Sequence, residues 1–169
     1  RLLELATLES PGMQVNSEPF NLGELVQDVI QKFQLTTEDK NIQVITNADE
    51  PIPFVNADIG LIERALENLI ENAVRHTPTD GEIRLQMTPS AEGIKMQISD
   101  SGPGIPEDFL PLVFKRFHQL DKSRKVDPGH TGLGLAITKK ILDLHGSSIE
   151  VSSNVGSGTS FSFQLPVHS

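Results

Sequence analysis

Residues 68–76 read Asn68-Leu69-Ile70-Glu71-Asn72-Ala73-Val74-Arg75-His76, and this stretch decides how the rest of the chain is interpreted. A helix turns about 100° per residue, which places Asn68, Asn72 and Arg75 within roughly 60° of one another on one face. Apolar side chains fall on a different face, which can be buried: Ile62, Leu66, Leu69, Ile70 and Ala73. Either this helix offers amide oxygens and a cation to a ligand, or it is an ordinary amphipathic helix with a solvated polar face.

The composition disfavours several classes of protein. The chain has 169 residues and a formal net charge of −9, which suits one globular domain and argues against nucleic acid as a partner. It contains no cysteine, so disulfides and thiolate metal sites are excluded. No apolar run approaches the roughly 20 residues of a membrane span, so no membrane contact is expected of this chain. The 5 histidines show no pair at helical ligand spacing, which disfavours a zinc site.

Hydrophobic periodicity predicts helices and strands along the whole chain. Helical spacing covers four ranges: 1–10, 21–33, 57 or 58 to 76, and 134–145. The first ends at the breaker Ser10-Pro11-Gly12, the second begins after the N-cap Asn21, and the last ends before Gly146. Alternating apolar and polar residues predict strands at 42–46, 82–88, 94–99, 149–153 and 159–166. About five strands, with three substantial helices bunched between strand pairs, favour an α+β sandwich. One face of a mixed sheet would be covered by helices.

Three glycine-bearing segments follow the asparagine helix. Asp100-Ser101-Gly102-Pro103-Gly104 comes directly after a strand, whose end can deliver a carboxylate to the sheet edge. Thr131-Gly132-Leu133-Gly134-Leu135 opens a helix, where free N–H groups and the positive dipole end attract phosphate. Gly156-Ser157-Gly158-Thr159 lies at a hairpin turn. Taken singly, each segment is compatible with an ordinary turn, and none has the Rossmann or Walker pattern.

In this order and spacing, the segments resemble the catalytic ATP-binding domain of sensor histidine kinases. That domain belongs to a superfamily shared with type II topoisomerases, MutL proteins and Hsp90 chaperones. The asparagine helix resembles the N box and Phe114-Lys115-Arg116-Phe117 the phenylalanine box. The segments at Asp100–Gly104, Gly132–Gly134 and Gly156–Gly158 resemble the three glycine boxes. The resemblance runs from about Asn21 to Pro166.

This resemblance implies a domain organisation. Residues 21–169 would form a Bergerat-type two-layer sandwich, whose mixed, mostly antiparallel sheet is covered on one face by three helices. An ATP lid would span about residues 105–131, and residues 11–20 would be a linker. Residues 1–10 would be the end of the second helix of a dimerisation domain.

The resemblance also implies roles for individual residues. Asp100 would accept a hydrogen bond from the adenine amino group, and Asn72 and Asn68 would hold Mg²⁺. Asn68, Asn72 and Arg75 would serve phosphoryl transfer, with Arg75 standing where the family usually has lysine. The other expected ATP contacts are His76, Gly102, Gly104, Ile105, Lys115, Arg116, Gly132, Leu133, Gly134, Leu135 and Thr159. Lys115, Arg116, Arg124 and Lys125 are candidate lid cations, for which solvated loop charge is the alternative. Phe114 and Phe117 are expected to anchor the lid.

The expected activity is that of an ATP-dependent protein-histidine kinase of a two-component system, acting with ATP and Mg²⁺. The alternatives are a hydrolytic ATPase, an anti-sigma-type serine kinase and a non-catalytic nucleotide-sensing module. Hydrolytic relatives have a glutamate four residues before the metal-binding asparagine. That position here is Asn68, whose amide cannot act as a base, while Glu67 and Glu71 point about 100° away from the two asparagines.

The expected partners follow from what this sequence lacks. The family's phosphoacceptor lies in the motif His-Glu/Asp-Leu-Arg-x-Pro, and none of the 5 histidines begins it. We therefore expect the phosphoacceptor, on a dimerisation domain of the same homodimeric protein, to lie upstream of Arg1. A cognate response regulator would receive the phosphoryl group. A cytoplasmic location is expected for this fragment, whether or not the full-length parent is anchored in a membrane.

Overall fold

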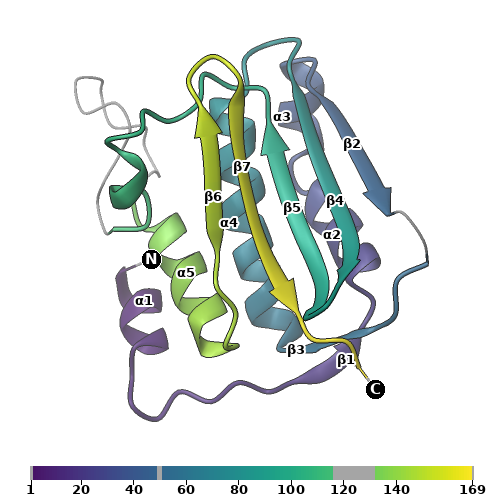
Figure 1. The fold of residues 1–169 in the computed structure, drawn as a ribbon, viewed down its shortest axis with the longest axis vertical. Helices are drawn as coiled ribbons and strands as arrows, with labels where there is room; N and C mark the ends of the chain where they lie inside the picture. The colour runs from purple at the N-terminus through teal and green to yellow at the C-terminus, as the bar shows by residue number, and fades with distance from the viewer. Residues whose placement is uncertain (1, 49–50, 116–131, 169) are drawn as a thin grey trace.

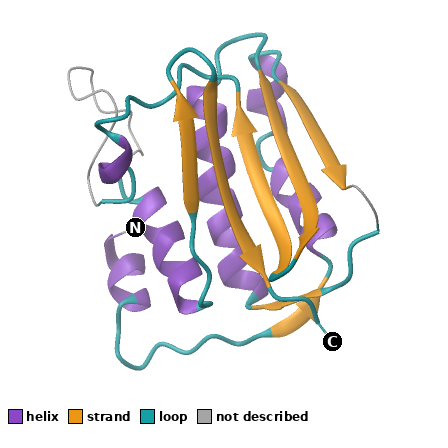
Figure 2. Ribbon diagram, in the orientation of Figure 1, coloured by secondary structure: helices purple, strands orange, loops and turns teal. Residues whose placement is uncertain are grey.

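A computed structural model describes residues 2–48, 51–115 and 132–168, which form two layers (Figures 1 and 2). The helices are α1 (Leu2–Leu8), α2 (Leu22–Gln31), α3 (Gln34–Asp39), α4 (Ile59–His76), the 3-10 turn η1 (Leu110–Leu112) and α5 (Gly134–Leu144). The strands are β1 (Glu18–Phe20), β2 (Gln43–Ala48), β3 (Val55–Ala57), β4 (Glu82–Ser90), β5 (Gly93–Asp100), β6 (Glu150–Asn154) and β7 (Gly158–Leu165).

The main sheet has the strand order β2-β4-β5-β7-β6. β2 runs parallel to β4, and the other neighbouring pairs are antiparallel. Figure 1 shows α2, α4 and α5 side by side on one face of this sheet. The predicted α+β sandwich, with a mixed and mostly antiparallel five-stranded sheet, is confirmed.

The helix ends follow the sequence signals. The side chain of Asn21 accepts a hydrogen bond from the Glu24 N–H at 3.1 Å and so caps α2. Asp58 caps α4 in the same way, through the Leu61 N–H at 3.2 Å. Gly146 follows α5 with φ of 69°, the left-handed conformation typical of a residue just beyond a helix end.

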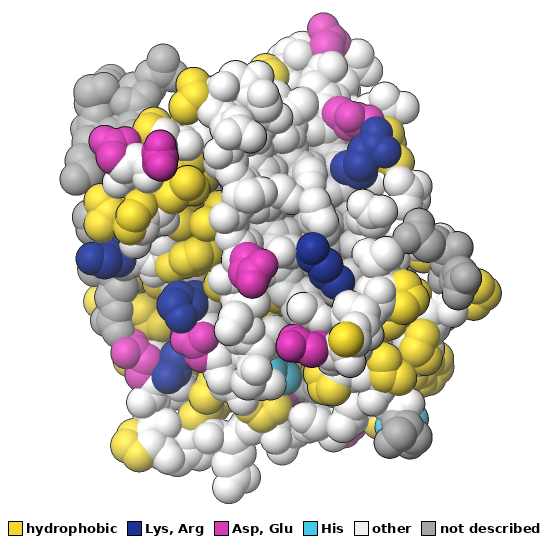
Figure 3. All heavy atoms as spheres, viewed as in Figure 1, with side chains coloured by type: hydrophobic (Ala, Val, Ile, Leu, Met, Phe, Trp, Pro, Cys, Tyr) yellow, Lys and Arg dark blue, Asp and Glu magenta, His cyan; other side chains and the backbone are white. Residues whose placement is uncertain are grey.

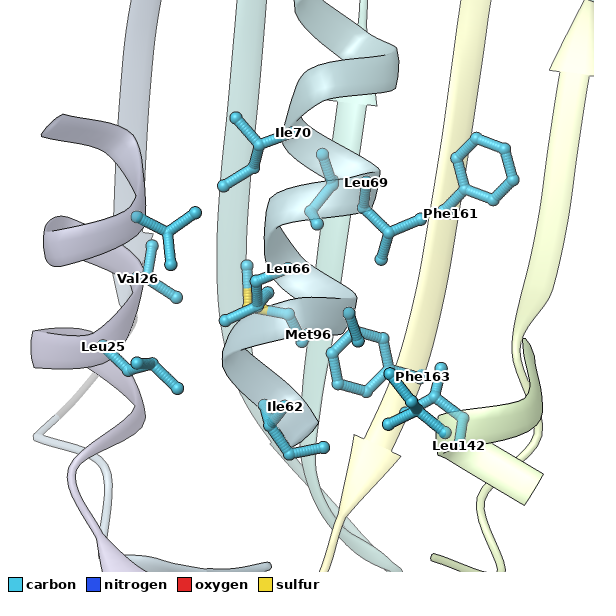
Figure 4. Close-up of a cluster of buried hydrophobic side chains, with 14 of the residues drawn as sticks. Leu25, Val26, Ile62, Leu66, Leu69, Ile70, Met96, Leu142, Phe161 and Phe163 are labelled. Carbon is cyan, nitrogen blue, oxygen red and sulfur yellow. The ribbon is translucent and has the colours of Figure 1, made fainter. Parts of the chain in front are cut away.

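The core lies between the sheet and its helices (Figure 4). Alternate residues of β4, β5 and β7 point into it, because successive side chains of a strand face opposite sides of the sheet. From the helix layer, α4 contributes the apolar face predicted from its spacing, which includes Leu66 and Leu69, both fully buried.

The strands β1 and β3 and the helix α3 were not predicted. β1 pairs antiparallel with β3, which joins the segment before α2 to the segment before α4. Val55 of β3 also bridges to Val167 near the chain end. The short helix α3 has one buried residue, Thr37, and Phe33, the residue just before it, provides no side-chain cap. Periodicity does not reveal elements of this length.

The face of the sheet turned away from the helices consists mainly of uncharged polar side chains (Figure 3). Among them, the hydroxyl oxygens of Ser99 and Ser160 lie 2.8 Å apart, and the Gln97 amide donates a hydrogen bond to the Ser160 hydroxyl at 2.9 Å. In the part of the chain that the structure describes, no helix has both the length and the apolarity to cross a membrane.

Shortening one core side chain tests this packing. Leu66→Ala is expected to lower the free energy of unfolding by about 3 kcal/mol, because it removes fully buried methyl groups and leaves a cavity. Leu35→Ala is the matched control: Leu35 is 85% exposed, and the change there should stay within about 0.5 kcal/mol. Urea denaturation measures both. A loss for Leu66→Ala as small as that of the control would contradict this core.

Candidate nucleotide site

The polar face of α4 contains the two predicted asparagines. Asn68 is only 4% exposed, whereas Asn72, one turn later, is half-buried. Neither the Oδ1 nor the Nδ2 atom of Asn68 has a hydrogen-bond partner among the described residues. An unpaired buried polar group costs about 1–3 kcal/mol. The two atoms therefore mark a place where a ligand, a metal or its water would supply the missing partner.

Arg75 and His76 lie at the C-terminal end of the same helix. The Arg75 guanidinium is 3.3 Å from the Glu71 carboxylate, one turn earlier on α4. The two side chains are 24% and 29% exposed, so this pair is only partly screened by water. Through its backbone, His76 meets the first glycine segment, since a Cβ atom on Gly102 would lie 2.6 Å from the His76 carbonyl oxygen. The asparagine helix and this segment are thus in contact.

Asp100 is the last residue of β5, between Ile83 of β4 and Thr159 of β7. It is 9% exposed, and its Oδ1 accepts a hydrogen bond from the Gly102 N–H at 2.8 Å. Burial raises the pKa of Asp100 above its usual value, although backbone N–H groups of Gly102 and Thr159 act in the opposite direction. A buried carboxylate at a strand end is suited to accept a hydrogen bond from a buried donor.

Two glycines let backbone segments approach each other around Asp100. Gly104 has φ of 82°, and a Cβ there would lie 2.3 Å from the Asn154 carbonyl oxygen. Gly158 has φ of 99°, and a Cβ there would lie 1.9 Å from the Asp100 carbonyl oxygen. A side chain at either position would therefore push the glycine segments apart.

Thr159 and Ile105 are linked through Ser153, a residue not predicted to be part of the site. The Ser153 hydroxyl lies 3.0 Å from the Thr159 hydroxyl and accepts a hydrogen bond from the Ile105 N–H at 2.7 Å. It also donates to the Gly158 carbonyl at 2.9 Å. Ser153 thus joins the start of the expected lid to the third glycine segment. It has no motif around it, and only the pairing of β6 with β7 brings it there.

The second glycine segment opens α5. Leu133 precedes the helix, is 1% exposed and provides no side-chain cap. Leu135 is partly buried against the same core. The burial of Leu133 fixes the position of the first turn of α5, whose N–H groups are the ones expected to meet phosphate.

The structure describes the expected lid only up to Lys115. Lys115 itself is exposed. Phe114 packs edge to face on Phe161 of β7, with ring centroids 6.0 Å apart. Arg116, Phe117, Arg124 and Lys125 lie outside the described residues, so their predicted roles are not tested.

Comparison with known proteins identifies the family. Residues 57–169 match the family described as histidine kinase-, DNA gyrase B- and HSP90-like ATPases. The chain belongs to this family. Sensor histidine kinase WalK of Bacillus subtilis is 33% identical over 167 residues, which are 98% of this chain and 27% of WalK. The phosphate regulon sensor protein PhoR of Pseudomonas aeruginosa is 32% identical over 160 residues, 95% of this chain and 36% of PhoR.

Solved structures agree with this family assignment. The catalytic domain of histidine kinase ThkA is 29% identical and superimposes with a TM-score of 0.78 over 92% of this chain and 97% of that one. Full-length ShkA, crystallised with AMPPNP, has a TM-score of 0.86 over 99% of this chain and 35% of ShkA. At 24% identity it supports the fold alone. The chain spans well under half the length of the curated relatives named above.

Within this ATPase family fold, four predicted positions meet at one end of the sheet. These are Asp100, Gly102, Thr159 and the His76 backbone. Asn68, Asn72 and Arg75 line one face of α4, the helix that ends at His76. The pairing of Arg75 with Glu71 was not predicted, although their four-residue spacing is typical of helical ion pairs.

Proposed function

We propose that this domain binds Mg·ATP and donates the γ-phosphoryl group to a histidine on a dimerisation domain of the same protein. Asp100 would accept the adenine amino group, with Gly102, Gly104, Ile105 and Thr159 shaping that pocket. Asn72 and Asn68 would hold Mg²⁺. Phosphate oxygens would meet Arg75, the lid residues Lys115 and Arg116, and the N–H groups of residues 132–135. His76 would pack against the ribose–phosphate region.

The described residues fit this ligand. The buried amide of Asn68 has no hydrogen-bond partner in the described part of the chain, and Asp100 is a buried acceptor at a strand end. In the described ranges, no three His, Cys, Asp or Glu side chains gather to hold a metal. A metal here would therefore use amide, phosphate and water oxygens, a set that suits Mg²⁺. Bound there, Mg²⁺ would neutralise phosphate charge.

One observation favours phosphoryl transfer to protein over hydrolysis. The buried position one turn before Asn72 is an amide, Asn68, which cannot take a proton from water. The neighbouring carboxylates are engaged in ion pairs, Glu67 with Lys32 at 2.8 Å and Glu71 with Arg75 at 3.3 Å. A positioned nucleophile from another domain is then the acceptor that this site suits.

In the proposed transfer, an imidazole nitrogen forms a bond to the γ-phosphorus while the bond to the β–γ bridging oxygen breaks. ADP leaves, and the imidazole proton passes to the acidic residue after the phosphoacceptor histidine. The names of the relatives, which include sensor histidine kinases and ThkA in complex with the response regulator TrrA, support this context. We infer a homodimeric cytoplasmic kinase module that serves a cognate response regulator.

Labelling in trans tests the proposal. The domain, γ-labelled ATP and Mg²⁺ are incubated with the parent's dimerisation domain, in its natural form and with the phosphoacceptor His→Gln. Acid-labile, alkali-stable label is expected on the natural form alone. Stable self-labelling, steady hydrolysis of ATP or acid-stable phosphoserine would contradict histidine transfer and indicate one of the other activities. Binding without any transfer would indicate a nucleotide sensor.

A further inference from the structure

The first helix, α1, packs against the helix layer of the domain. Figure 1 shows α1 beside α5, the helix that begins at the second glycine segment. Its apolar residues Leu5 and Leu8 are 3% and 4% exposed, so one face of α1 is buried. Any change in the docking of α1 therefore acts next to the helices expected to hold phosphate.

An ion pair joins α1 to α4. The Glu4 carboxylate accepts two hydrogen bonds from Arg64, at 2.6 Å from Nε and 3.1 Å from Nη2. The side chains are 32% and 26% exposed. Two-point pairing of this kind has a fixed geometry and is stronger than a single contact. The hydrogen bond that Arg64 donates to Glu4 is the main reason that the Arg64 pKa is raised, with the charges of Glu4, Glu67 and Glu71 contributing and burial opposing them.

From Arg64, charged side chains continue along one side of α4 to the proposed phosphate contact, with two glutamates between two arginines. Arg64 Nη1 lies 3.6 Å from Glu67 Oε2, one turn on. The charge of Glu71, a further turn on, also acts on Arg64. Glu71 in turn pairs with Arg75 at 3.3 Å. Residues three or four apart on a helix are neighbours, so these charges form one continuous stripe from α1 to Arg75.

We propose that this stripe couples the docking of α1 to the ATP site, with Arg64 and Glu71 as positioning residues. While Glu4 holds Arg64, Glu71 holds Arg75. When Glu4 releases Arg64, the Arg64 guanidinium interacts more strongly with Glu67 and Glu71. The ion pair between Glu71 and Arg75 then weakens, and Arg75 turns to the phosphates. The docked α1 thus restrains ATP binding. This inference rests on the proposed function, because it assigns Arg75 to phosphate.

Calorimetry with Mg·ATP on charge-neutral variants tests the coupling. Glu4→Gln is expected to tighten Mg·ATP binding by about two- to fivefold, the range set by one partly exposed ion pair. Glu71→Gln should tighten it similarly. The double variant should bind no more tightly than Glu71→Gln alone, because the proposed effect of Glu4 on Arg75 passes through Glu71. The affinity for adenosine, which has no phosphate, should stay unchanged in all three.

The controls separate this coupling from other effects. Asp143→Asn removes an exposed carboxylate of α5 that pairs with Lys139, and it should leave Mg·ATP affinity unchanged. Unchanged or weaker binding by Glu4→Gln would overturn the inference. Gains in Mg·ATP affinity that multiply in the double variant would also overturn it, because they would indicate a general charge effect. A parallel change in adenosine affinity would do so too, because it would indicate altered packing. If the wild-type domain binds no Mg·ATP, the proposed function itself fails.

Discussion

Asp100→Asn is expected to weaken ATP binding about 100-fold, since a hydrogen bond to a charged acceptor contributes about 1.5–3 kcal/mol. The buried carboxylate presents only acceptors, whereas the amide replaces one oxygen with a donor that would face the adenine amino group. Calorimetry with ATP and GTP measures the change. We expect the preference for ATP over GTP to shrink with the affinity.

The same substitution should stabilise the ligand-free domain. Burial raises the pKa of Asp100, so ionising it disfavours the folded state. The folded state binds its proton more tightly than the unfolded state. Stability therefore falls as the pH rises from the ordinary value of 3.8 through the raised pKa. In thermal unfolding, the melting temperature of Asp100→Asn should be higher than that of wild type at pH 7. This difference should become smaller as the pH falls towards 3.8.

Two experimental results would contradict the proposed role of Asp100. Equal ATP affinity of wild type and Asp100→Asn would exclude Asp100 as the adenine acceptor. A lower melting temperature of the variant at pH 7 would show that the carboxylate stabilises the fold instead. Asp143→Asn is the control for both measurements, because it alters an exposed carboxylate on α5.

Asn72→Ala is expected to lower the rate of phosphoryl transfer by about 10²–10³, the usual effect of removing one group that stabilises charge in the transition state. The alanine lacks the amide oxygen proposed to hold Mg²⁺. Binding of ATP in the presence of EDTA should change little, because the adenine pocket is untouched. Transfer to the dimerisation domain and calorimetry with and without Mg²⁺ measure the two effects.

Asn47→Ala provides the matched control for Asn72→Ala. Asn47 is a half-buried amide on β2, away from α4, and the control should transfer phosphate at the wild-type rate. If Asn72→Ala keeps its magnesium dependence, the metal is held elsewhere. If it loses affinity equally with and without Mg²⁺, Asn72 contributes to packing and not to metal binding.

The sequence predicted the main elements well because their signals are local. Period-two alternation marked β2, β4, β5, β6 and β7, and the predicted cap Asn21 lies where α2 begins. The burial of Asp100 is also foreseeable, since it ends a strand whose alternate residues are buried. Local patterns did not reveal β1 and β3, which have 3 residues each and exist through long-range pairing.

The sequence by itself determined the sheet-and-helix class, the apolar face of α4 and the order of the motifs. Only the tertiary structure decided that β2 runs parallel to β4 and that Ser153 reaches both Ile105 and Thr159. It alone placed Glu4 against Arg64 and buried the Asn68 amide where no described residue is its hydrogen-bond partner. Periodicity reports which side of an element is apolar. Contacts between residues far apart in sequence depend instead on how the layers pack.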